Sequence, residues 1–109
     1  MYRYDFAPRL LRLAGLGATH ATELFAVFGR RGFGVRTLTA LGGRRGLRTV
    51  TDTMQNHWLE FARSGRPLET WPRYSSERRE TLIVDEVCRV ESDPLGHRRE
   101  AWRGYRHRH

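Results

Sequence analysis

An amphipathic helix predicted over residues 47–64 constrains the fold of this chain more than any other feature. Its apolar residues recur at helical spacing and form one stripe, which consists of Leu47, Val50, Met54, Trp58 and Phe61. Gly65 and Pro67 stop the helix. Because Trp58 and Phe61 would each bury a large area, the stripe needs a sheet or a neighbouring helix to cover it.

Two strands are predicted, one near each end of the chain. Residues 2–6 alternate aromatic and polar, which places Tyr2, Tyr4 and Phe6 on one face of a strand that Pro8 ends. Residues 81–84 are predicted to form the second strand. A single strand cannot satisfy its own backbone groups, so we expect the partners of the first strand to come from sequence outside this chain.

A glycine-bearing loop separates the first strand from a short apolar helix and carries one histidine. Gly15 and Gly17 allow backbone angles that other residues resist, so the loop can turn sharply and present His20 at its tip. From residue 21 the apolar residues recur at helical spacing, and Gly29 is a natural C-cap. A histidine held on a loop by a rigid scaffold can transfer protons near neutral pH.

The remaining segments indicate a piece of a larger fold. With 109 residues the chain holds one small domain at most. Residues 29–46 and 65–80 are nevertheless predicted to form long loops, which a domain of this size should not contain. A closing helix is predicted over residues 94–102, with Asp93 as its cap, and the tail 103–109 is expected to fray.

Several motifs in series resemble the type-B carboxylesterase and cholinesterase family. Residues 17–29 are similar to that family's Gly-x-x-His-x-x-Glu-Leu segment, which runs into Phe-Gly. Residues 54–67 resemble its Trp-x-x-Phe-Ala-x-x-Gly-x-Pro helix end, and residues 71–74 its Trp-Pro-x-Tyr step. Residues 81–85 match a late strand, and residues 99–102 match a closing helix more loosely.

This resemblance implies the C-terminal portion of an α/β-hydrolase fold, incomplete on its own, made of a strand, a histidine loop, an amphipathic helix, a late strand and a closing helix. In the family the histidine is the general base of a Ser-His-Glu triad, so His20 would be that base. Glu23 matches a glutamate that is structural or supports the histidine. The substrate of the complete enzyme would be a small-molecule ester, and the partner of this chain would be the missing N-terminal part of the same fold.

The nucleophile of such an enzyme is absent from this chain. An α/β-hydrolase carries its serine on a Gly-x-Ser-x-Gly elbow, and the triad follows the chain order serine, acid, histidine. None of the four serines here, Ser64, Ser75, Ser76 and Ser92, stands in such an elbow. A C-terminal segment would keep the histidine alone, and we expect this segment by itself to be inactive.

The basic composition leaves a second function open. The net charge is +8, and every basic residue apart from the histidines is arginine. Such a balance can mean binding to nucleic acid or to another anionic partner, as a small basic binding protein. The arginines are scattered in ones and twos along the sequence, which instead favours a codon bias of a GC-rich genome, so nucleic-acid binding is not the expected function.

Other residue types suggest no cofactor, metal or membrane segment. Cys88 is the only cysteine, so no intrachain disulfide is possible, and a buried inert thiol is expected. His97, His107 and His109 have no second ligand cluster and make a poor metal site. His57 beside the apolar stripe is expected to pack rather than catalyse. No targeting signal or spanning segment is predicted, which would mean a cytoplasmic protein if the start is genuine.

Overall fold

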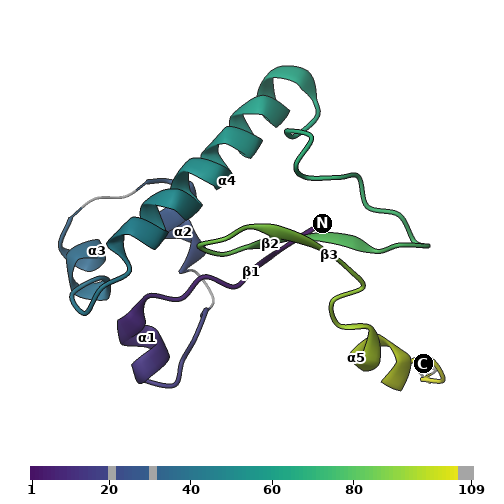
Figure 1. The fold of residues 1–109 in the computed structure, drawn as a ribbon, viewed down its shortest axis with the longest axis horizontal. Helices are drawn as coiled ribbons and strands as arrows, with labels where there is room; N and C mark the ends of the chain where they lie inside the picture. Colours follow the sequence, from purple (N-terminus) through teal and green to yellow (C-terminus); the bar gives the residue numbers. More distant parts are fainter. Residues whose placement is uncertain (20–21, 30–31, 106–109) are drawn as a thin grey trace, which may run out of the picture.

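The structure, a computed structural model, describes residues 1–19, 22–29 and 32–105. Figure 1 shows a small sheet with the longest helix running diagonally above it. In chain order the elements are β1 (Tyr2–Tyr4), α1 (Arg9–Leu13), α2 (Glu23–Val27), α3 (Phe33–Leu38), α4 (Arg44–Ser64), β2 (Glu80–Val84), β3 (Arg89–Ser92) and α5 (Gly96–Ala101).

The sheet joins the first residues of the chain to its last third. Its strand order is β1-β2-β3, so β2 is central. β1 runs parallel to β2, with Tyr2 opposite Leu82 and Tyr4 opposite Val84, and β3 pairs antiparallel with β2. The expectation that the partners of β1 lie outside this chain is therefore wrong for one of its edges. The local sequence predicts that residues 2–6 form a strand. It does not predict which strand pairs with them, because β2 lies far along the chain.

β2 has the burial of a strand covered on both faces. Thr81, Leu82, Ile83 and Val84 are all buried. A strand that is hydrogen-bonded on both edges and covered on both faces carries a continuous apolar run rather than an alternating one. The predicted strand over residues 81–84 is confirmed, with its start one residue earlier.

α4 contributes three of the seven described residues of the buried core cluster, more than any other element. It starts three residues before the predicted helix and ends at the predicted place, where Gly65 has a left-handed φ of 77°. The first three residues of its apolar stripe, Leu47, Val50 and Met54, are buried. Trp58 is half-buried, and Phe61 is 58% exposed, so Phe61 is not covered by the described part of this chain. The buried core cluster consists of Phe6, Ala26, Leu47, Val50, Met54, Leu82 and Val84.

The predicted loop over residues 29–46 is wrong, because it contains all of α3 and the first turn of α4. Gly46 lies in that turn and is buried. A Cβ atom there would lie 2.7 Å from Cε2 of Phe6 and 2.6 Å from Oε1 of Glu86. This glycine therefore allows α4 to pack closely against the segments that follow β1 and β2. From the sequence alone, Gly46 is predicted to be a loop residue.

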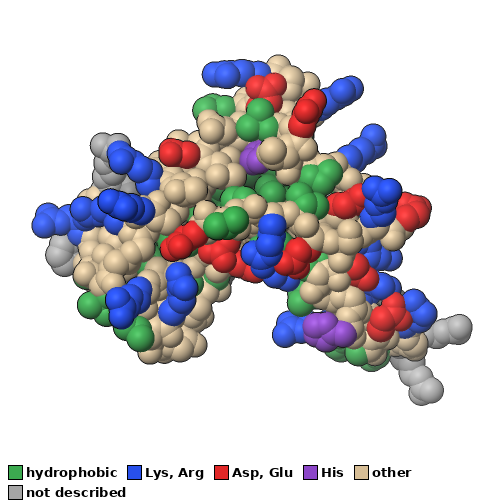
Figure 2. All heavy atoms as spheres, viewed as in Figure 1, with side chains coloured by type: hydrophobic (Ala, Val, Ile, Leu, Met, Phe, Trp, Pro, Cys, Tyr) green, Lys and Arg blue, Asp and Glu red, His purple; other side chains and the backbone are tan. Residues whose placement is uncertain are grey.

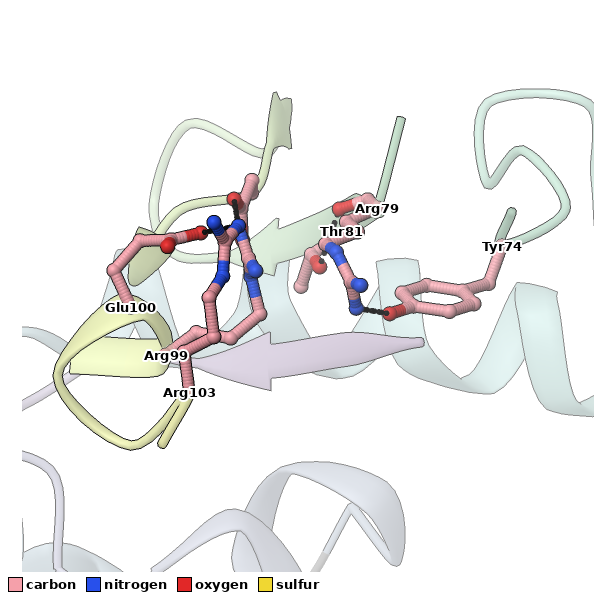
Figure 3. Close-up of polar contacts among 7 residues, drawn as sticks. Tyr74, Arg79, Thr81, Arg99, Glu100 and Arg103 are labelled. Carbon is pink, nitrogen blue, oxygen red and sulfur yellow. Dashed lines mark hydrogen bonds and ion pairs between the residues drawn. The ribbon is translucent and has the colours of Figure 1, made fainter. Parts of the chain in front are cut away.

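Residues 65–79 contain no helix or strand. Side-chain hydrogen bonds join this segment to the first residue of the chain and join two of its own residues to each other. The indole Nε1 of Trp71 donates a hydrogen bond to the carbonyl of Met1 at 2.8 Å. Arg79 Nη1 donates to the hydroxyl of Tyr74 at 3.0 Å, as Figure 3 shows. The second predicted loop ends where β2 begins, at Glu80.

The C-terminal helix begins later than expected. α5 starts at Gly96, two residues after the predicted start, and no side chain caps it. The predicted cap Asp93 instead pairs with Arg99, at 2.8 Å between Oδ2 and Nη2. Arg99 and Arg103 both contact Oε1 of Glu100 at 2.8 Å (Figure 3). Of the tail expected to fray, residues 106–109 lie outside the described residues.

α1 and β3 were not predicted from the sequence. α1 is a five-residue helix without a side-chain cap, and β3 is a largely exposed edge strand whose apolar alternation is short. Neither carries enough periodicity to be recognised from local sequence.

Candidate functional site

The residues directly after α1 form a tight turn that contains two glycines. Gly15 and Gly17 have φ values of 74° and 62°, as the sequence predicted for a sharp turn. The backbone N–H groups of Leu16 and Gly17 both donate to the carbonyl of Leu11, at 3.0 and 3.3 Å. These bonds close the end of α1 and reverse the chain toward Thr19.

His20 and Ala21 lie outside the described residues, so the role predicted for His20 stays a prediction. Hydrogen bonds join the residues on either side of them. The carbonyl of Thr19 accepts two hydrogen bonds from Thr22, one from Oγ1 at 2.6 Å and one from the backbone N–H at 3.2 Å. Thr19 and Thr22 are therefore held close together at the start of α2.

Glu23, the first residue of α2, is bonded to the sheet. Its Oε2 accepts a hydrogen bond from the Tyr2 hydroxyl at 3.2 Å. Burial, the charge of Glu23 and this bond raise the pKa of Tyr2. Burial, followed by the charges of Glu23 and Asp85, raises the pKa of Tyr4. Glu23 thus fixes α2 onto β1, and its contribution to the histidine stays a prediction.

No pattern in the sequence predicts this tyrosine–glutamate contact. From the sequence, Tyr2 is predicted only to lie on the aromatic face of a strand. A tyrosine that is buried against a core needs an acceptor for its hydroxyl group, and that requirement is the signal that could have suggested a carboxylate partner.

His57 is part of an aromatic cluster, which we define as Tyr2, His57, Trp58 and Trp71. Its ring meets Trp71 edge-on at 5.4 Å, and Trp58 stacks on Trp71 at 5.3 Å with an interplanar angle of 28°. His57 is only 3% exposed, and its Nε2 lies 3.4 Å from Oγ1 of Thr70. Its Nδ1 has no hydrogen-bond partner within the described residues. The expectation of a packing histidine is confirmed.

Burial lowers the pKa of His57 below its ordinary value of 6.5, which makes stability depend on pH. Below about pH 6.5 the unfolded chain binds a proton at this site more readily than the folded chain. Stability is therefore expected to be fully present above about pH 6.5 and to fall as the pH drops from about 6.5 toward the lowered pKa. Urea unfolding at about pH 7.5 and 5.5 measures this loss.

The matched variant is His57→Gln, in which every other histidine remains. It should lose less stability over the same pH interval. An equal loss in both proteins would contradict the assignment of the effect to His57.

The serine hydroxyls and the cysteine thiol lie close to carbonyl or carboxylate oxygens of nearby residues. Ser64 Oγ donates to the carbonyl of Glu60, Ser75 Oγ to the carboxylate of Glu80, and Ser76 Oγ to that of Glu77. Cys88 is half-buried rather than buried, and its Sγ lies 3.4 Å from the carbonyl of Asp85. Within the described part of the chain, none of these three serines is paired with an imidazole base.

The described residues contain neither a metal-binding cluster nor a membrane-spanning helix. No group of three or more His, Cys, Asp or Glu side chains there could hold a metal ion. None of the helices described is both long enough and apolar enough to cross a membrane.

Comparison with known proteins tests the resemblance of the motifs. No protein-family model matches the chain. Para-nitrobenzyl esterase of Bacillus subtilis (strain 168) is 34% identical over 103 residues, which cover 92% of this chain and 20% of that enzyme. The chain therefore spans about one fifth of the length of this relative.

Solved structures give the same result. A PNB esterase superposes with a TM-score of 0.71 at 33% identity, over 92% of this chain and 21% of its own. A carboxylesterase of Geobacillus stearothermophilus superposes with a TM-score of 0.72 at 33% identity, over 94% of this chain and 21% of its own. These neighbours are α/β-hydrolases, and the small mixed sheet with its helices is consistent with part of that fold.

The similarity extends over almost the whole chain in both sequence and structure. The chain is therefore homologous to para-nitrobenzyl esterase, and the similarity supports a C-terminal segment of the type-B carboxylesterase family.

Proposed function

We propose that this chain is the C-terminal part of a serine carboxylic-ester hydrolase and that it supplies the histidine of the catalytic triad. The observation that carries the proposal is the homology to an esterase over 92% of the chain. The Gly-x-x-His-x-x-Glu-Leu pattern that begins at Gly17 selects His20 among the five histidines.

In the complete enzyme His20 accepts the proton of the serine hydroxyl as that oxygen attacks the ester carbonyl. It then returns a proton to the departing alcohol oxygen. A glutamate from the rest of the enzyme holds the imidazole in the required tautomer, and the donors that stabilise the oxyanion also lie there.

The described neighbours of His20 suit this task. The two glycines reverse the chain before it, and the paired hydrogen bonds between Thr22 and Thr19 hold its flanks. The bond from Tyr2 to Glu23 anchors the next helix to the sheet. A general base must be held in place to be effective, and these contacts would restrict the segment that carries it.

The proposal implies that the chain alone does not hydrolyse esters, because it contains no Gly-x-Ser-x-Gly elbow. The test is a chimera in which this chain replaces the matching segment of the Bacillus subtilis enzyme. The isolated chain should hydrolyse a para-nitrobenzyl ester no faster than buffer, and the chimera should turn it over. Hydrolysis by the isolated chain, abolished by a serine-directed inhibitor, would contradict the proposal.

A further inference from the structure

A groove lies between α2, α3 and the first half of α4. Its volume is about 850 Å³, which is within the range of pockets that hold a single small ligand. The residues that line the groove come from three helices and the residues beside their ends, so no local sequence motif predicts the groove.

The floor of this groove is apolar. Leu47 is buried, Phe25 and Val35 are half-buried, and Phe28 is 67% exposed at the edge. A side chain as large as Phe28 that stays exposed beside a concave apolar floor is available to cover the apolar part of a ligand.

The rim of the groove is basic. It carries the exposed arginines Arg36, Arg44, Arg45 and Arg48, and Figure 2 shows arginine side chains gathered over α3 and the start of α4. Asp52 is the one carboxylate among the described residues that line it. The tertiary structure therefore adds Arg36 of α3 to the three arginines at the start of α4.

Among the described residues, the four arginines of the rim are not neutralised by a carboxylate. Within these ranges none of them takes part in an ion pair; some arginines elsewhere do, such as Arg3, Arg89 and Arg99, and others, such as Arg63, do not. Like charges held close together repel one another, and a bound anion relieves that repulsion. Arginine suits such an anion because its planar fork binds a carboxylate through two parallel hydrogen bonds.

We propose that this groove binds one small anion with an apolar body, of the class of a medium-chain fatty carboxylate. The carboxylate lies against the basic rim and the alkyl chain against Phe28 and the floor formed by Phe25, Val35 and Leu47. A polyanion would use the rim and leave the apolar floor uncovered, and a membrane surface does not fit a concave site. The inference does not depend on the proposed esterase function, since it uses neither His20 nor a serine.

The test is equilibrium dialysis of decanoate against the full 109-residue chain, which reports bound ligand whatever the state of association. We expect saturable binding of one equivalent per chain. Decanol lacks the charge and acetate lacks the apolar body, so each should bind at least about tenfold more weakly than decanoate. Equal binding of decanol and decanoate would overturn the proposal.

The variants separate the rim from the floor. Arg45→Gln combined with Arg48→Gln should weaken decanoate binding by about tenfold or more, and Phe28→Ser should weaken it by a similar factor. Arg63→Gln is the matched control, because Arg63 is exposed in the last turn of the same helix and outside the groove. All these side chains are exposed, and far-UV circular dichroism verifies that the fold is kept.

Two further outcomes would overturn the proposal. One is decanoate binding that the rim and floor variants leave unchanged. The other is tighter binding of a single-stranded oligonucleotide or of anionic lipid vesicles that depends on the same arginines.

Discussion

Replacing His20 by Ala in the chimera is expected to lower the turnover of a para-nitrobenzyl ester by about 10⁴-fold or more. The reason is that the serine hydroxyl, with a high pKa, is a weak nucleophile until a neighbouring imidazole accepts its proton. Because that proton transfer occurs in the transition state, kcat should fall and KM should change little. Steady-state kinetics at a pH of about 8, where an ordinary imidazole is neutral, measures both constants.

The matched control is His57→Gln, since both histidines belong to this chain. His57 is enclosed by Trp71 and Thr70, and a glutamine there keeps a polar side chain of comparable reach. Its kcat should stay close to that of the unmodified chimera, while its stability falls. Unimpaired turnover in the His20→Ala chimera, or an equal loss of kcat in both variants, would disprove the assignment of His20.

The second large effect is expected at Trp58. Trp58 stacks on Trp71 at 5.3 Å and meets the ring of Tyr2 edge-on at the same distance. Trp58→Ala removes both contacts and leaves a gap between α4 and the sheet. For this half-buried indole the expected loss is about 3 kcal/mol in the free energy of unfolding, the lower end of values for tryptophan truncation. Urea unfolding of the 109-residue chain, followed by circular dichroism, measures it.

Phe61→Ala is the control for this prediction. Phe61 belongs to the same apolar stripe, but it is 58% exposed within this chain. Its removal should change the free energy of unfolding by less than about 1 kcal/mol. Equal losses for the two variants would mean that the stripe is covered along its whole length, for example by a second copy of the chain.

The sequence by itself determined the elements whose signals are local. The apolar stripe and Gly65 specified α4 and its end, since a 3.6-residue period and a left-handed glycine act within a few turns. The apolar run from Leu82 specified β2. The positive φ values of Gly15 and Gly17 followed from residue type alone.

Only the tertiary structure decided which of these elements meet. The pairing of β1 with β2 depends on a register between the two ends of the chain, which no local pattern encodes. A glycine is needed at position 46 of α4 because Phe6 occupies the space where a Cβ would lie. The basic groove exists because the fold places Arg36 of α3 and the apolar residues of α2 and α3 beside the arginines at the start of α4. In each case the deciding interaction joins residues far apart along the chain, so its energy becomes available only once the fold has formed.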